Sequence, residues 1–155
     1  MTQEKNSEKE IHTKFAKGLF NLTWSFLDKK DRTKEDNDKM ISAAHASHYH
    51  WLEIGTPLEF ERGEWQISRV YSVLNMPESA LYHAKRCLEI CQANKYGDFD
   101  IAFAYESMAR ANAVADNKTE SKKYIELAKK AGEKISSKED RDYFFSELKK
   151  IPGYE

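Results

Sequence analysis

The sequence has little of what interrupts helices or staples small folds. Its 155 residues include 6 glycines, 3 prolines and 2 cysteines. So few glycines and prolines leave few places to break a helix, which favours long helices over a strand-and-turn architecture. A chain of this length buries about two thirds of its unfolded surface, so it needs no disulfide or metal to fold. With 40% hydrophobic residues, the composition predicts one domain with an ordinary core.

An excess of charge of one sign is also absent. Lys and Arg number 25 against 26 Asp and Glu, and the formal net charge is −1. Nucleic-acid-binding proteins usually carry a basic excess, so this balance disfavours that class. No apolar run reaches the roughly 18 residues of a membrane span, and residues 1–10 lack the apolar core of a secretory signal. We therefore expect a cytoplasmic protein that binds neither nucleic acid nor membranes.

The two cysteines, Cys87 and Cys91, lie four residues apart on a predicted helix. Helical rise and pitch place their Cα atoms about 6 Å apart on adjacent turns. A disulfide at this spacing would constrain almost nothing. The pattern therefore indicates two reduced and mostly buried thiols, as is usual for cysteine in a cytoplasmic protein.

Apolar residues recur every three or four positions along nearly the whole chain, as in amphipathic helices. The first such stripe comprises Ile11, Phe15, Leu19, Leu22 and Phe26. Ser7 and Glu10 have the spacing of a capping box, in which each side chain bonds the other residue's backbone N–H. The sequence therefore predicts a first helix over residues 8–28, after a disordered tail at 1–8.

Further breaks divide the rest of the chain into six more predicted helices. Gly55 ends the second helix, Thr56 and Pro57 open the third, and Pro77 opens the fourth. Short connections imply antiparallel packing of neighbouring helices. We therefore predict a single all-α domain over residues 9–155, with helix pairs at about 9–55, 57–95 and 99–134 and a capping helix at 137–151.

The chain matches itself when it is shifted by 41 residues, which aligns the third and fourth predicted helices with the fifth and sixth. Ile67 then falls on Met108, and Ser68 falls on Ala109. Apolar residues meet apolar residues and small residues meet small ones. Small side chains are needed where the two helices of a hairpin approach closely, so the match predicts two copies of one helix–turn–helix unit.

This pattern resembles the tetratricopeptide repeat, a helix–turn–helix unit with small residues where its two helices cross. The motif's large, small and aromatic positions are occupied by Ile67, Ser68, Tyr71, Ala80 and Cys87 in the first unit and by Met108, Ala109, Ser121 and Ala128 in the second. The spacing of 41 exceeds the family's usual ~34 residues. Residues 63–71 also resemble a group of small bacterial tetratricopeptide-like proteins with no assigned role. The resemblance implies a right-handed stack of antiparallel helix pairs, and the alternative is an irregular helical bundle.

In a tetratricopeptide array, the first helix of each pair lines a concave groove that holds peptide segments. By that register the groove carries Arg62, Trp65, Arg69, Phe103, Glu106 and Arg110. Arginine suits carboxylates and stacks on aromatic rings. The resemblance therefore implies a protein-interaction module, without enzymatic activity or cofactor, that binds an acidic peptide or partner segment. The alternative is an internal lattice in which Arg69 or Arg110 pairs with Glu64 or Glu106.

Two other functions remain open at this point. His45 and His48 share one face of the second helix, and with Glu61 or Glu64 they would give a metal-dependent or small-ligand enzyme. The HExxH spacing is absent, however, and His48 lies in an apolar stripe, which favours a packed, hydrogen-bonded histidine. The third function is a self-associating structural domain, a homodimer formed through the aromatic residues 143–145.

Overall fold

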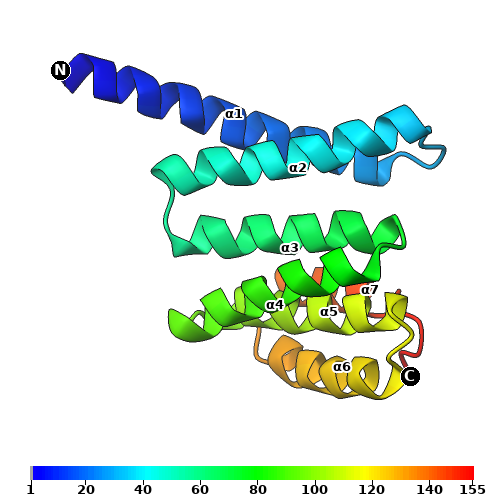
Figure 1. Ribbon diagram of the computed structural model, residues 1–155. Helices are drawn as coiled ribbons and strands as arrows, with labels where there is room; N and C mark the ends of the chain where they lie inside the picture. Colours follow the sequence, from blue (N-terminus) through cyan, green and yellow to red (C-terminus); the bar gives the residue numbers. More distant parts are fainter. Residues whose placement is uncertain (1) are drawn as a thin grey trace.

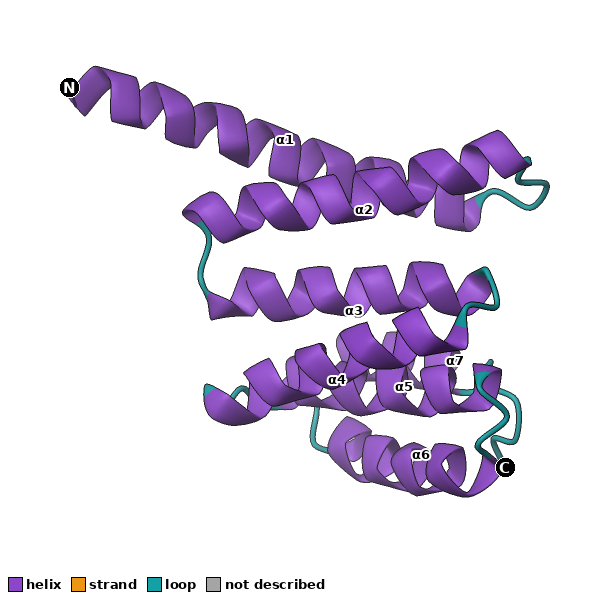
Figure 2. Cartoon of the chain, viewed as in Figure 1, coloured by secondary structure: helices purple, strands orange, loops and turns teal. Residues whose placement is uncertain are grey.

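The structure, a computed structural model, describes residues 2–155, and side chains for residue 4 and residues 6–155. The described chain forms seven α-helices and no strand: α1 (Thr2–Asp28), α2 (Lys34–Ile54), α3 (Pro57–Val73), α4 (Pro77–Ala93), α5 (Asp98–Val114), α6 (Lys118–Glu133) and α7 (Lys138–Leu148). The closest packing is within the pairs α1–α2, α3–α4 and α5–α6, and α7 lies against α5 and α6 (Figures 1 and 2). The fold is therefore the predicted all-α stack of antiparallel helix pairs. Over the described residues, every helix is too short or too polar to cross a membrane.

The first helix begins earlier than the sequence predicts. α1 starts at Thr2 and runs through Ser7, so residues 2–8 are helical here and the predicted helix start at Glu8 is wrong. This stretch contains neither glycine nor proline, and its Lys and Glu residues are good helix formers, so nothing local ends the helix. Met1, which belongs to the predicted tail, lies outside the described residues.

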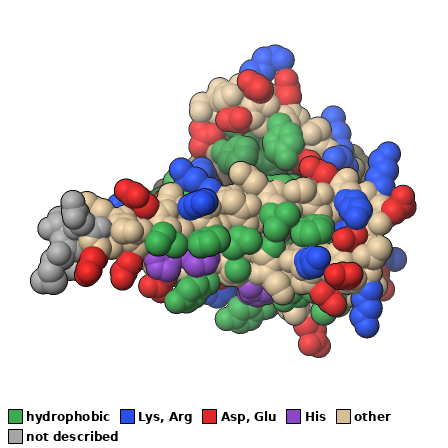
Figure 3. Space-filling view, turned by 90° about the horizontal axis from the view of Figure 1, so that it is seen from above, with side chains coloured by type: hydrophobic (Ala, Val, Ile, Leu, Met, Phe, Trp, Pro, Cys, Tyr) green, Lys and Arg blue, Asp and Glu red, His purple; other side chains and the backbone are tan. Residues whose placement is uncertain are grey.

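The extended α1 leaves part of its predicted apolar stripe uncovered. Ile11, Phe15 and Leu22 remain 52%, 48% and 43% exposed, whereas Phe26 packs against the buried cluster around Met40. The first turns of α1 project beyond the end of α2 (Figure 1). Apolar and histidine side chains consequently lie together at the surface of this layer when it is seen from above (Figure 3).

A capping box that was not predicted from the sequence starts α2, with Thr33 as its N-cap. The Asp36 backbone N–H donates to Thr33 Oγ1 at 3.1 Å, and the Thr33 backbone N–H donates to the Asp36 carboxylate at 3.0 Å. The box satisfies two backbone donors at the helix start. Asp takes the place of the usual Glu or Gln in this box, which explains why the spacing went unrecognised.

The hairpin crossings use the small residues that the 41-residue match identifies. Ser68 Oγ donates to the Ala80 carbonyl oxygen at 2.8 Å between α3 and α4. Ser121 Oγ donates to the Ala109 carbonyl oxygen at 3.0 Å between α6 and α5. Positions 68 and 109 are equivalent, as are 80 and 121, so the same hydroxyl bridge forms in both hairpins with the donor on opposite helices.

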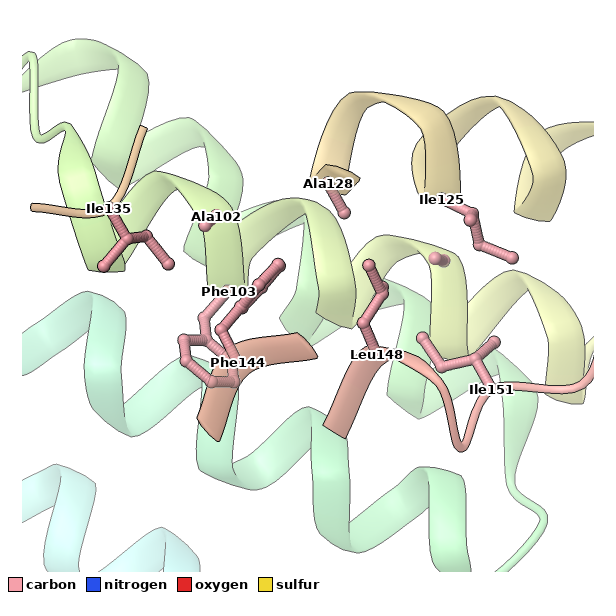
Figure 4. Close-up of a cluster of buried hydrophobic side chains, with 9 residues drawn as sticks. Ala102, Phe103, Ile125, Ala128, Ile135, Phe144, Leu148 and Ile151 are labelled. Carbon is pink, nitrogen blue, oxygen red and sulfur yellow. The ribbon is translucent and has the colours of Figure 1, made fainter. Parts of the chain in front are cut away.

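The C-terminal helix completes the largest buried cluster, which Figure 4 shows in close-up. Phe144 and Leu148 of α7 are fully buried, and the Phe144 ring meets the Phe103 ring edge-on with centroids 4.9 Å apart. Gly132 of α6 leaves room for the Phe144 ring, because a Cβ atom at position 132 would lie 2.5 Å from Phe144 Cε2.

Two of the three aromatic residues at positions 143–145 therefore pack within their own chain. Phe144 is buried, and Phe145 packs against the same cluster. Tyr143, 45% exposed, is the one member of the three that remains at the surface. The density of exposed aromatic residues on which predicted self-association depended is thus reduced to a single ring.

Candidate functional site

A cavity of about 500 Å³ opens between α1, α3, α4, α5 and α7. It is lined by Phe20, Trp24, Glu61, Arg62, Trp65, Cys87, Phe99, Asp100, Phe103, Asp140 and Tyr143. Six of these eleven residues are aromatic. The volume lies within the usual range for ligand pockets, and the flat rings offer large apolar surface at low conformational cost. We call this cavity the aromatic pocket.

Four rings form a continuous row across the aromatic pocket, one from each of four helices. The Trp24 centroid of α1 lies 5.5 Å from that of Trp65 in α3, and Trp65 lies 5.5 Å from Phe103 of α5. Phe103 in turn lies 6.0 Å from Tyr143 of α7. These spacings are those of favourable aromatic pairs. Trp65 and Phe103 belong to the predicted groove, whereas Trp24 and Tyr143 were not predicted, because no local pattern shows that α1 packs near Trp65 or α7 near Phe103.

Arg62 lines the aromatic pocket, as predicted, and it holds Asp100 through two hydrogen bonds. Nε donates to Oδ1 at 2.9 Å and Nη2 donates to Oδ2 at 3.2 Å. The hydrogen bond to Asp100 raises the pKa of Arg62. The Arg62 side chain is still 50% exposed.

The predicted residues Arg69, Glu106 and Arg110 form a buried ionic network next to the aromatic pocket. Glu106 is fully buried and accepts hydrogen bonds from Arg110 Nε at 2.9 Å and Nη2 at 2.8 Å, and from Trp65 Nε1 at 3.1 Å. Arg69 lies 3.6 Å from Glu106 and 3.3 Å from Glu147 of α7. Burial opposes ionisation of Glu147, but the nearby Arg69 and Lys150 lower its pKa. The internal lattice therefore forms, with Glu106 as the predicted partner and Glu147 as an unpredicted one.

This pairing changes the electrostatic character expected of the groove. The side chains of Arg69 and Arg110 are only 14% and 13% exposed, and Arg62 is bound to Asp100. Each of the three arginines thus already has a carboxylate partner within the chain. The positive charge that the predicted groove arginines would offer is therefore already balanced within the chain. An acidic ligand would have to compete with these internal carboxylates.

His45 and His48 lie in a separate polar cluster between α2, α3 and α4. The Glu64 carboxylate lies 2.5 Å from His83 Nδ1 and 3.4 Å from His48 Nε2, and His45 Nε2 lies 2.8 Å from the Tyr71 hydroxyl. His48 Nε2 is buried and has no hydrogen bond. Within residues 2–155, neither His45 nor His48 belongs to a set of three converging metal-ligating atoms. The cluster thus contains the predicted Glu64 but not the geometry of a three-ligand metal site.

Acidification is expected to destabilise the protein through this cluster. Burial lowers the pKa of both His48 and His45, so the folded state binds fewer protons than the unfolded state. Their contribution to the free energy of unfolding is full above about pH 6.5 and is lost as the pH falls below it. We expect urea unfolding curves between pH 7 and pH 5 to show this loss in the wild type.

The matched variant in this experiment is His48→Gln. It should remove up to about 1.4 kcal/mol per pH unit of the slope below pH 6.5. His12→Gln, on α1 and outside the cluster, provides the control. An unchanged slope in His48→Gln would show that His48 is not held neutral by its surroundings.

Both cysteines are buried and free, as the spacing predicts. Comparisons with models of known families, with curated proteins and with solved structures give no match. The fold and the aromatic pocket themselves therefore define the class: an all-helical stack of antiparallel pairs with an aromatic pocket on one face.

Proposed function

We propose that this chain is a tetratricopeptide-like interaction module that binds a segment of a partner protein in the aromatic pocket. The observation that carries the proposal is the row of rings from Trp24 to Tyr143, to which four helices contribute. Rigid aromatic side chains that are partly open to solvent are typical anchors of protein–protein contacts. The 41-residue match and the repeated hydroxyl bridge of the two hairpins support the family assignment.

The charges of the lining favour a particular kind of segment. Burial and the neighbouring Asp100 raise the pKa of Glu61 to about 11, so Glu61 is neutral at physiological pH. The other acidic and basic residues of the lining are Asp100, Asp140 and Arg62, so acidic residues outnumber basic ones by one. We therefore propose a segment with an aromatic or large apolar anchor next to a Lys or Arg, whose cation stacks favourably on a tryptophan.

Selection of a displayed peptide library on the immobilised protein tests this proposal. We expect enrichment of peptides that combine an aromatic residue with an adjacent basic residue. Trp24→Ala removes the ring at the α1 end of the row, and it should weaken the enriched peptides at least tenfold, or about 1.4 kcal/mol. Titration calorimetry provides the dissociation constants, and thermal unfolding verifies that the variant is folded.

Tyr82→Ala is the control, because Tyr82 is an aromatic residue of α4 that is 61% exposed and absent from the lining. Equal affinity for the wild type and Trp24→Ala would contradict the proposal. Enrichment of acidic peptides that fail to bind Arg62→Ala would instead support the acidic ligand expected from the sequence.

A further inference from the structure

Beside the aromatic pocket, three metal-ligating side chains converge from two helices. Cys91 Sγ lies 3.2 Å and Cys87 Sγ lies 4.0 Å from the same carboxylate oxygen of Glu61. The three donor atoms all lie within 4.8 Å of one another, and no other His, Cys, Asp or Glu triplet within residues 2–155 converges so closely. All three residues are buried, with exposures of 2% or less. The cluster is thus a buried set of three potential ligands.

Helix geometry explains why these atoms meet. Residues four apart on α4 stand one above the other on one face, so Cys87 and Cys91 present two sulfur atoms in the same direction. α3 and α4 form one hairpin, held by the bridge from Ser68 to Ala80. This hairpin brings the Glu61 carboxylate against both sulfur atoms. The donors therefore sit on two rigid elements, which favours a preorganised site.

The spacing of the donors suits a tetrahedral ion. Zinc binds thiolate sulfur at about 2.3 Å and carboxylate oxygen at about 2.0 Å, so neighbouring donors in a tetrahedron lie about 3.5 to 3.8 Å apart. The observed oxygen–sulfur separations of 3.2 and 4.0 Å bracket this range. Small rotations of the side chains would therefore complete the geometry without any movement of the helices.

The electrostatics of the cluster also call for a cation. The Glu61 carboxyl group and the two thiol groups can each give up a proton to become a metal ligand, and all three side chains are buried. A divalent ion would replace these protons and supply the positive charge that buried carboxylate and thiolate groups require. Arg62 cannot fill this role, because its guanidinium is bound to Asp100.

We propose that Glu61, Cys87 and Cys91 form a binding site for a thiophilic divalent metal ion of the zinc type. The carboxylate in the set favours zinc over Cu(I), which prefers sulfur ligands alone. Glu61 and Cys87 also line the aromatic pocket, which provides an entry path for the ion. The fourth coordination position faces this pocket, where water or a group of a bound molecule completes the tetrahedron.

Cobalt(II) and zinc(II) titrations of the reduced, metal-stripped protein test the site. Tetrahedral cobalt(II) bound to thiolate has an intense sulfur-to-metal charge-transfer absorption and strong visible bands. We expect both features to saturate at one ion per chain. Zinc should displace the cobalt, with a dissociation constant below about 1 μM in competition with a chromophoric chelator. Cys91→Ala should abolish the charge-transfer band or weaken zinc binding at least a hundredfold.

Two further variants keep the result interpretable. Glu61→Gln retains the shape of the neutral acid and should fold, but it should weaken zinc binding at least tenfold, which serves if Cys91→Ala fails to fold. His83→Gln alters the neighbouring histidine cluster and should leave the Kd for zinc unchanged. Absence of the charge-transfer band in the wild type, equal zinc affinity in wild type and Glu61→Gln, or loss of binding in His83→Gln would each overturn the proposal.

Discussion

Replacing Glu106 by alanine is expected to lower the free energy of unfolding by about 3 to 5 kcal/mol. Glu106 is fully buried, accepts hydrogen bonds from Arg110 and Trp65, and lies 3.6 Å from Arg69 as an ion pair. Its removal leaves the Arg110 guanidinium largely buried without a carboxylate, while Arg69 keeps Glu147. The cost is large because an uncompensated buried charge is far less stable than a buried pair. Equilibrium urea unfolding followed by circular dichroism measures the difference.

Two controls separate the loss of charge from the loss of a side chain. Glu106→Gln keeps the shape and one acceptor oxygen, so it isolates the ionic part of the effect. Arg86→Ala breaks an ion pair with Glu89 whose side chains are 44% and 61% exposed, and surface pairs contribute about 0 to 1 kcal/mol. If Glu106→Ala proved no more destabilising than Arg86→Ala, the buried network would not contribute to stability as proposed.

Phe144→Ala is expected to lower the free energy of unfolding by about 3 to 5 kcal/mol. The ring is fully buried and meets Phe103 at 4.9 Å and Phe145 at 5.3 Å between centroids. Truncation leaves a cavity where α7 contacts α5 and α6, and this contact is the main apolar attachment of α7. We therefore expect α7 to detach before the rest of the stack unfolds. Amide hydrogen exchange over residues 138–148 detects this local opening.

Tyr143→Ala, on the same helix, is the matched control. Its ring is 45% exposed, so its loss should change the free energy of unfolding by less than about 1 kcal/mol. Equal amide protection of α7 in wild type and Phe144→Ala would contradict the prediction. Because Tyr143 and Asp140 line the aromatic pocket, detachment of α7 should also weaken any ligand held there.

Helical periodicity and turn chemistry were sufficient to predict most of the architecture. The three-to-four spacing of apolar residues indicated every helix, and Pro57 and Pro77 occupy the first positions of α3 and α4 as expected. Ser137 caps α7, within the predicted start of that helix. These features are local, so each depends only on neighbours in the chain. The predicted start of α1 at Glu8 was wrong, because the capping-box spacing of Ser7 and Glu10 does not interrupt a continuous run of helix formers.

The aromatic pocket could be predicted only in part. Of the six residues that counting from Ser68 and Ala109 assigns to a groove, Arg62, Trp65 and Phe103 line the pocket, and their role in binding stays a prediction. The same counting could not show that the arginines were already paired. The sequence shows which residues share one face of a helix, but not which side chains of other helices contact that face.

The sequence by itself thus determined the helices, their pairing into hairpins and the small residues at the hairpin crossings. Only the tertiary structure decided the rest: that α7 brings Glu147 to Arg69 and Tyr143 to the aromatic row, that Trp24 of α1 joins this row, and that Glu61 lies against the two cysteines. The physical reason is that hydrogen bonds within a helix and its apolar period depend on neighbouring residues. Contacts between charges and rings on different helices depend instead on how those helices are stacked.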